Sequence, residues 1–367
     1  VTSGEWRCPV HSVDPDPLSL GSLANPSRHQ GPISVAGRDP QTLRDMYRSM
    51  LNIRLVEQKL AKMRELGMIG GPVHLGVGQE AAAVGVSQHL RATDRVFGAH
   101  RSHSHALALG ASVEGLFAEV LGRDTGLSRG MGGSMHLWDQ PNGFYGSVPI
   151  VAGTVPLAVG AALAAKMQQS GDVAVSYLGD GAVEEGVVHE SLNLASQLGV
   201  PVIFVVENNL FASHMHMSLR QPSDSTARFA EANAIRYAVV DGNDIGEVSD
   251  VANELISRAR EGGGPGFIEA VTFRWYGHVD WREDIDVGVN RASDDLENWR
   301  LRDPVQRLLS ALISHGYWTD NEAEELRSTL DEEIERAWLS ASQAPFPPPE
   351  ALLDRVYFQA PTGQTKR

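Results

Sequence analysis

The fold of this chain is decided by residues 179–209, which read GDGAVEEGVVHESLNLASQLGVPVIFVVENN. Apolar residues recur with helical spacing over 183–198, and Gly199 and Pro201 are typical of the end of a helix. The next residues, PVIFVV at 201–206, are continuously apolar, as in a strand that is buried on both faces. The stretch therefore predicts a helix followed by a buried parallel strand, with polar residues at both ends of the unit.

The same alternation continues along the chain. Strands are expected at 172–178, 235–242 and 264–275, and helices at 41–66, 154–169, 245–262 and within the charged segment 300–341. Residues 95–110 should hold a short strand and then a loop dense in histidine. This pattern predicts an α/β fold, with a mainly parallel sheet flanked by helices and a helical C-terminal part.

The domain organisation follows from composition. Residues 1–40 are rich in Pro, Ser, Gly and Asp without a period, which indicates a flexible or draped extension. Residues 41–343 are expected to form one domain, and 344–367 an extended tail.

Composition and charge exclude several classes of protein. The chain has 367 residues, a net charge of −15 and one cysteine, Cys8, so a disulfide framework within the chain is excluded and a cytoplasmic location is expected. Cys8 and His11 alone do not make a zinc site. The sequence contains no run of about 18 apolar residues, so no membrane span is expected. No secretory signal is visible at the start of the given sequence. The acidic balance argues against nucleic-acid binding.

Asp180 and Asn209 each follow a predicted strand directly. A right-handed crossover brings both to the same rim of the sheet, where open α/β sheets bind ligands. Their oxygens suit Mg²⁺, which also takes phosphate oxygens, and Gly179 and Gly181 allow close approach of a ligand. GDG alone is more often a simple turn, but with this strand, helix and strand it predicts a metal-bridged diphosphate.

The wider sequence resembles a known family. GDG with NN at 208–209 is similar to the signature of thiamine-diphosphate enzymes. Further segments carry the resemblance: HLGVGQEA (74–81), HRSHSHALALG (100–110), RGMGGSMH (129–136), GFYGSVPIVAGTVPLAVGAALA (143–164) and RWYGH (274–278). Together they resemble the alpha subunit of the 2-oxo acid dehydrogenase first component, the pyruvate and acetoin dehydrogenase class, over residues 41–357. The resemblance implies thiamine diphosphate and Mg²⁺ as cofactors.

The resemblance also implies roles for individual residues. Those expected around the metal are Asp180, Asn209 and the carbonyl of Phe211. Those expected around the diphosphate are His100, Arg101, His278 and the backbone of Gly181 and Ala182. Pro149 and Val151 would hold the aminopyrimidine ring. His74 would lie over the thiazolium ring and handle protons, with His278 as the second catalytic histidine.

Purely structural roles are the alternatives for several of these residues. Arg101 could be a surface arginine, and His74 and His278 could be structural loop residues. His103 and His105 are expected to order their loop rather than bind a metal. Glu184 and Glu185 are expected to be helix N-terminal charges that favour the helix dipole, with a subunit-interface role as the alternative.

This chain departs from the family at several positions. His100 stands in place of a tyrosine, Met131 in place of a basic residue, and YGHVDWREDID lacks the usual phosphoserine positions. The loop LFASHMHMS carries His214 and His216. These histidines suggest the hypothesis of a hydroxylated or phosphorylated donor.

Thiamine enzymes need a glutamate that protonates the aminopyrimidine ring, and in the family this residue comes from a separate pyrimidine-binding domain. No second α/β domain of that kind is visible in this sequence. The resemblance implies that a beta subunit supplies this glutamate, in an α2β2 heterotetramer with residues 126–153 and the helix 154–169 near the interface. The acceptor would be a lipoyl domain or an acyl-carrier protein.

Three functions remain open at this point. The leading one is a 2-oxo acid or acetoin dehydrogenase alpha subunit. The second is a transketolase-like chain that cleaves a ketose and passes two carbons to an acyl-carrier protein. The third is a non-catalytic cofactor-binding subunit. A nicotinamide-binding protein fits poorly, because no strand leads into GxGxxG with an acid following.

Overall fold

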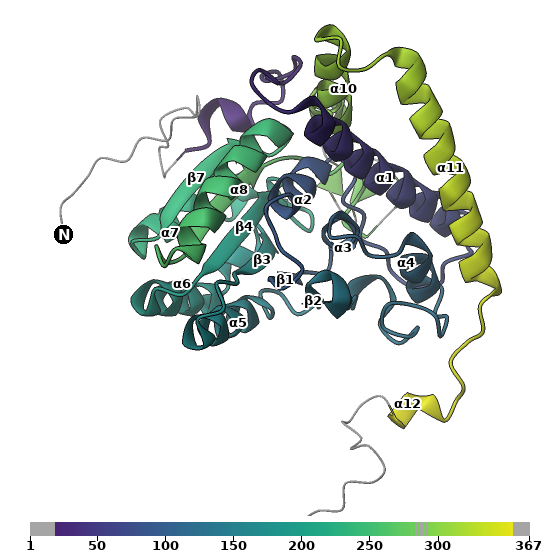
Figure 1. Ribbon diagram of the computed structural model, residues 1–367, viewed down its shortest axis with the longest axis horizontal. Coiled ribbons are helices and arrows are strands. Elements are labelled where there is room, and N and C mark those ends of the chain that lie inside the picture. The colour runs from purple at the N-terminus through teal and green to yellow at the C-terminus, as the bar shows by residue number, and fades with distance from the viewer. Residues whose placement is uncertain (1–18, 280, 283–284, 287–288, 291–292, 355–367) are drawn as a thin grey trace, which may run out of the picture.

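A computed structural model describes residues 19–279, 281–282, 285–286, 289–290 and 293–354. Its centre is a six-stranded sheet in the order β2-β1-β3-β4-β8-β7, in which every neighbouring pair is parallel (Figure 1). The strands are β1 (Arg95–Gly98), β2 (Phe144–Ser147), β3 (Ala174–Gly179), β4 (Val202–Asn208), β7 (Arg236–Asp241) and β8 (Gly266–Val271). Two short hairpins, β5 (Phe211–Ala212) with β6 (Met215–His216) and β9 (Ile285–Asp286) with β10 (Val289–Asn290), lie outside it. The predicted α/β fold is confirmed.

Helices flank both faces of the sheet (Figure 1). The described helices are α1 (Pro40–Glu65), α2 (Glu80–Ser87), α3 (His103–Ala108), α4 (Val113–Val120), α5 (Val155–Gln168), α6 (Gly186–Leu198), α7 (Ala227–Ala232), α8 (Ile245–Arg260), α9 (Ser293–Arg300), α10 (Pro304–Ser314), α11 (Asp320–Gln343) and α12 (Ala351–Asp354). α5, α6 and α7 share a core with one face, whereas α1, α2 and α8 share a core with the other. No described helix has the combination of length and apolar character that crossing a membrane requires.

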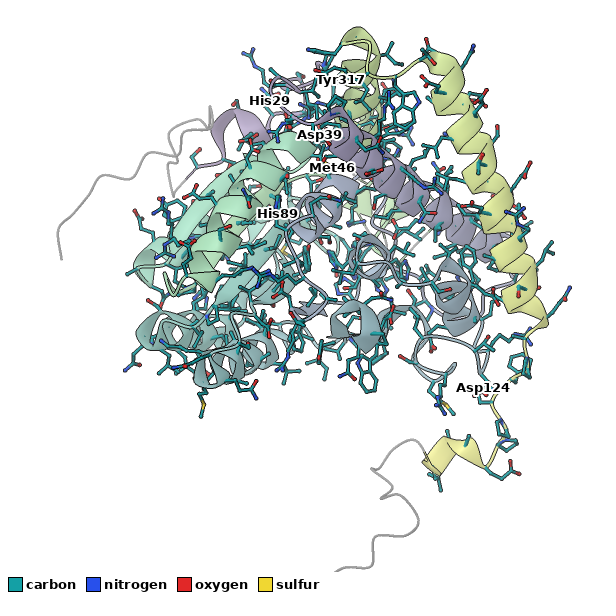
Figure 2. All side chains as sticks on the ribbon, in the orientation of Figure 1. His29, Asp39, Met46, His89, Asp124 and Tyr317 are labelled. Carbon is teal, nitrogen blue, oxygen red and sulfur yellow. The ribbon has the colours of Figure 1, made fainter. Side chains whose placement is uncertain are left out.

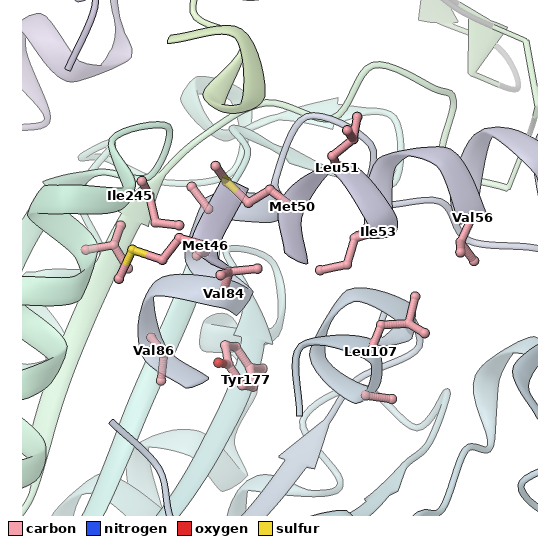
Figure 3. Close-up of a cluster of buried hydrophobic side chains, with 14 of the residues drawn as sticks. Met46, Met50, Leu51, Ile53, Val56, Val84, Val86, Leu107, Tyr177 and Ile245 are labelled. Atoms are coloured by element: carbon pink, nitrogen blue, oxygen red, sulfur yellow. The ribbon is translucent and has the colours of Figure 1, made fainter. Parts of the chain in front are cut away.

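The continuously apolar strands explain why helices pack on both faces of the sheet. In β3, Val175 and Tyr177 enter one core while Ala174 and Leu178 enter the other. Successive side chains of a strand point to opposite faces, so a continuously apolar strand buries both. Figure 3 shows Tyr177 facing Val84 and Val86 of α2, with Met50 of α1 beyond them. This packing holds the carboxyl ends of the strands in place at one rim.

The described part of the segment before α1, residues 19–39, packs against the domain. Leu20, Leu23, Ile33 and Val35 are buried. The guanidinium of Arg302 donates hydrogen bonds to the carbonyls of Leu23 and Asn25. Residues 1–18 lie outside the described part of the chain, and with them Cys8 and His11.

The helical C-terminal part was also expected. α11 packs along α1 and α4 at one side of the domain (Figure 1). After α11 the chain runs past Asp124, whose amide donates to the carbonyl of Pro345 at 2.9 Å (Figure 2). The short α12 then follows, and 355–367 lie outside the described residues.

Two local expectations need correction. The histidine-rich segment is not only a loop, because α3 forms at His103–Ala108 directly after His100 and Arg101. The helix expected over 183–198 starts later, at Gly186, and a 3₁₀ turn at Ala182–Glu184 precedes it. That turn keeps the backbone of 180–182 at the rim of the sheet.

Candidate active site

A cavity of about 370 Å³ opens where β1, β3 and β4 end. It is lined by the eleven residues that the family resemblance places at the metal and the cofactor: His74, His100, Arg101, Pro149, Val151, Asp180, Gly181, Ala182, Asn209, Phe211 and His278. They come from six separate stretches of chain between residues 74 and 278. The fold therefore brings the whole predicted set together at one place.

Asp180 and Asn209 occupy the ends of the paired strands β3 and β4. Asp180 is only 2% exposed; burial raises the pKa of this carboxyl group, and Arg220 opposes the rise. The side-chain oxygen of Asn209 accepts from the amide of Phe211 at 3.2 Å, and its nitrogen donates to Gln79 at 3.1 Å. Buried acid and amide oxygens side by side are the donor set that a hard cation needs.

The chemistry of this position supports a cation. The guanidinium of Arg220 contacts the carboxylate of Asp180 and also that of Glu184. A buried carboxylate is stable only with such a partner. The residues present therefore fit a bound Mg²⁺, and Arg220 is a positive charge beside Asp180.

Gly181 needs to be glycine for a steric reason. A Cβ built at this position would lie 2.5 Å from the Cβ of Ala212, which belongs to the β5–β6 hairpin. The hairpin thus lies directly against the GDG turn. Its backbone is unusual, since Leu210 and Ser213 both have positive φ, at 68° and 50°.

Three histidine rings meet at one side of the cavity. His74 lies edge-on to His100 and His278, with centroid distances of 4.7 and 5.2 Å. Burial and the neighbouring Arg101 lower the pKa of His74 to about 2 and that of His100 to about 3. Both rings are therefore neutral at neutral pH. The buried Nδ1 of His74 has no hydrogen-bond partner, so it is available to form a hydrogen bond with a ligand.

Arg101 holds the histidine cluster together. It donates to the carbonyl of Leu75 at 2.5 Å and to both Nδ1 and the carbonyl of His278 at 3.3 Å. The side chain is buried, which contradicts the surface-arginine alternative. A buried guanidinium beside neutral imidazoles forms a donor surface suited to phosphate oxygens.

His103 lies next to the site and connects two of its loops. His103 lies between Glu57, at 3.2 Å, and Ser134, at 2.8 Å, and Glu57 also accepts the amide of Gly76. His103 therefore ties the His74 loop to the glycine-rich loop, in keeping with the expected ordering role.

His105 does more than expected, because it lines the cavity. Its ring stacks on Tyr177 with a centroid distance of 3.8 Å. Its Nε2 lies 3.2 Å from an oxygen of Glu207. The cavity floor is therefore a compact cluster of polar side chains.

The opposite rim is apolar and open. Ile150 is 71% exposed and Val151 is 51% exposed, although both line the cavity. Val151 thus presents its side chain to the space where the resemblance places the aminopyrimidine ring.

The two unusual histidines of the loop after Asn209 lie apart. The ring of His214 is 6.2 Å from that of His278, whereas His216 packs on Phe211 at 5.0 Å. Neither is among the residues that line the cavity. The donor hypothesis built on them stays a prediction.

Sequence reasoning missed several polar residues at this site. Glu207 and Tyr177 line the cavity from buried strands, where they read as part of an apolar run. Glu185 was interpreted as a helix charge and also lines the cavity. Arg220 reaches Asp180 only because the β5–β6 hairpin turns the chain back, and no sequence pattern signals that contact.

Comparison with known proteins gives a consistent result. The family described as dehydrogenase E1 component matches residues 47–350. The alpha subunit of an acetoin:2,6-dichlorophenolindophenol oxidoreductase from Bacillus subtilis is 39% identical over 87% of this chain and 94% of its own length. The corresponding subunit from Cupriavidus necator is 39% identical over 87% and 95%. The alpha subunit of the pyruvate dehydrogenase E1 component from Rhizobium meliloti is 36% identical over 76% and 80%.

Proposed function

The chain belongs to the dehydrogenase E1 component family, and we propose that it is the alpha subunit of a thiamine-diphosphate-dependent dehydrogenase. The enzyme would cleave a 2-oxo acid or acetoin and pass the acyl unit oxidatively to a carrier-bound acceptor. One observation carries the proposal above all: eleven residues implied by the family resemblance line a single cavity at the carboxyl edge of the sheet.

The metal and diphosphate would share the rim formed by β3 and β4. Asp180, Asn209 and the carbonyl of Phe211 would hold Mg²⁺. The backbone of Gly181 and Ala182 can approach phosphate oxygens, since residue 181 has no side chain. In support of this assignment, Asp180 is buried and lies against the cationic side chain of Arg220.

The cationic and imidazole groups would bind the other phosphate oxygens. Arg101 presents planar guanidinium donors beside His100 and His278, so all three can reach one anion. Hydrogen bonds within the chain, from Arg101 to Leu75 and His278, hold these donors in position. Such preorganisation reduces the entropy cost of binding.

When bound, thiamine diphosphate supplies a carbon nucleophile and an electron sink. His74 is the chain's candidate for moving protons on the donor, because its buried Nδ1 has no hydrogen-bond partner. Its ring is neutral, so one ring nitrogen can accept a hydrogen bond from the donor while the other can donate one. Pro149 and Val151 would hold the aminopyrimidine side through apolar contact.

A partner is part of the proposal. The relatives that this chain matches are named as alpha subunits, which implies a beta subunit that would carry the pyrimidine-side domain. A beta subunit in an α2β2 assembly would supply it, together with the glutamate that protonates the aminopyrimidine. A lipoyl domain or an acyl-carrier protein would be the acceptor.

A donor panel tests the function. The full chain, co-purified with its beta partner, is given thiamine diphosphate and Mg²⁺, and reduction of an artificial electron acceptor is followed. Pyruvate, branched 2-oxo acids, acetoin and ketose phosphates are compared. Turnover of a 2-oxo acid or acetoin is the expected result. Turnover of a ketose alone, or none with bound cofactor, contradicts the proposal.

A further inference from the structure

Arg220 is a buried arginine that contacts the carboxylate of Asp180 and that of Glu184 at the same time. Asp180 is the acid that the proposed Mg²⁺ needs. A guanidinium and a divalent cation that share one buried carboxylate repel each other. Binding of the metal should therefore weaken this ion pair.

The arginine is held by its own hairpin. Its Nε donates to the carbonyl of Met215 at 3.1 Å, and its amide donates to the carbonyl of Met217 at 2.9 Å. The hairpin places Ala212 against Gly181, so Arg220 and the GDG turn are neighbours. Leu210 and Ser213 hold left-handed backbone conformations, which are unfavourable for residues that carry a side chain.

The surroundings of the two acids differ. The side chain of Asp180 is 2% exposed, that of Arg220 is 7% exposed and that of Glu184 is 26% exposed. Salt and water screen an interaction at Asp180 weakly. Glu184 stays within reach of Arg220 whether or not Asp180 is available, so it can keep the arginine after the exchange.

We propose that Arg220 is an exchangeable counter-ion that neutralises Asp180 in the metal-free chain, moves to Glu184 alone when the metal binds, and so sets the metal affinity of the site. The inference rests on the proposed function, because it takes Asp180 as a metal ligand. It adds a residue outside the cavity lining to those that control loading of the cofactor.

Manganese binding tests the exchange. Mn²⁺ stands in for Mg²⁺, and electron paramagnetic resonance counts the free ion in the presence of thiamine diphosphate, using the full chain with its partner. Arg220→Gln removes the competing cation, so Mn²⁺ should bind about tenfold more tightly, equivalent to about 1.4 kcal/mol. Arg220→Lys keeps the charge and should bind close to wild type. Arg236→Gln, which breaks the distant ion pair with Glu254, is the matched control and should change nothing.

A thermal measurement supplies an independent readout. Without metal, Arg220→Gln should have a lower Tm than wild type, because Asp180 loses its partner. Saturating Mn²⁺ should then raise its Tm by more than it raises that of wild type. An equal or smaller rise would contradict the exchange.

Substitution of Glu184 tests the direction in which Mn²⁺ affinity changes. Glu184→Gln should weaken Mn²⁺ binding, because Arg220 then has only Asp180 to pair with. The same substitution should have no effect in the Arg220→Gln background. An effect that persists there means that Glu184 acts directly on the metal, which overturns the exchange. Unchanged or weaker binding by Arg220→Gln also overturns it. If wild type shows no saturable Mn²⁺ binding with thiamine diphosphate, the proposed cofactor role fails instead.

Discussion

At the scale of single residues, the site depends on how closely the β5–β6 hairpin approaches the GDG turn. Gly181 and Ala212 are in contact, with no room for one more methyl group between them. In the same region the amide of Phe211 donates to the side chain of Asn209, and Arg220 contacts Asp180. The absence of a side chain at residue 181 is therefore a packing requirement as well as a route for a ligand to reach the backbone.

Substitution of Gly181 tests that requirement. Gly181→Ala should push the hairpin away and weaken binding of thiamine diphosphate with Mg²⁺ by at least about tenfold, or about 1.4 kcal/mol. Ala212→Gly removes the obstructing methyl group, so the double variant should recover most of the affinity. Titration calorimetry measures both. If the double variant binds no better than Gly181→Ala, the loss comes from the backbone of residue 181 and not from contact with Ala212.

Individual site residues were predictable to different degrees. Asp180 and Asn209 followed from their places after two strands, and the Arg101 and His278 positions followed from family resemblance. Arg220, Glu207 and Tyr177 were not predictable, because their contacts arise from a hairpin and from buried strands. A local sequence pattern shows how residues are spaced within one helix or strand. It does not show which residues of separate elements come into contact.

At the scale of elements, the start of α8 concentrates acidic groups. Asp244 caps the helix by accepting from the amides of Gly246 and Glu247. Glu247 accepts from the amide of Asp241 at 3.3 Å. Burial, with repulsion from Asp241 and Asp244, raises the pKa of Glu247 to about 8. This helix therefore starts with a carboxyl group that is protonated at neutral pH.

The raised pKa of Glu247 predicts a pH effect on stability. In the unfolded chain this carboxyl ionises near its ordinary value of 4.5, so between 4.5 and about 8 the folded state binds more protons. Stability contributed by this group should therefore fall as pH rises through that window. Glu247→Gln keeps an acceptor without the charge and should be more stable than wild type at pH 9, by roughly 1 to 3 kcal/mol.

Denaturant unfolding at pH 5 and pH 9 measures the effect. The advantage of Glu247→Gln should largely disappear at pH 5, where the wild-type group is protonated in the folded state. Glu261→Gln, an exposed acid just after the same helix, is the control and should show no such difference. Equal stability of Glu247→Gln and wild type at pH 9 would mean that the carboxylate is accommodated without cost.

Element types were more predictable than element boundaries. The buried strands and the long helices can be predicted from apolar periodicity, because the same apolar residues form the core. The start of α6 was placed too early, because the 3₁₀ turn at Ala182–Glu184 has a helix-like composition. The histidines of HSHALA favour a loop from the sequence alone, whereas the structure forms α3 there. In both places the fold, and not local preference, decides the backbone.

At the scale of the whole molecule, one helix leaves an apolar face uncovered. Leu157 is 57% exposed and Met167 is 76% exposed, and Gly160 lies between them on α5 with open space around it. Ile150, at the cavity rim, is close to the start of the same helix in sequence. A surface of this kind marks a protein interface. Its continuity with the open side of the cavity agrees with a partner that completes the site.

A charge on that face should therefore prevent assembly without unfolding the chain. Leu157→Glu is expected to weaken association with the beta subunit by at least about tenfold, because a carboxylate would have to be buried in an apolar contact. Light scattering after size-exclusion chromatography measures the species formed. Leu339→Glu is the matched control: Leu339 is 56% exposed on α11, far along the chain from α5, and should assemble normally.

The two variants also separate assembly from cofactor binding. The isolated Leu157→Glu chain should keep its Tm, since the side chain contributes little to the core. Activity should fall in parallel with the fraction of assembled protein, because the pyrimidine side of the site would come from the partner. Full assembly of Leu157→Glu would place the beta subunit on another face, and the exposed side of the cavity would then need a different explanation.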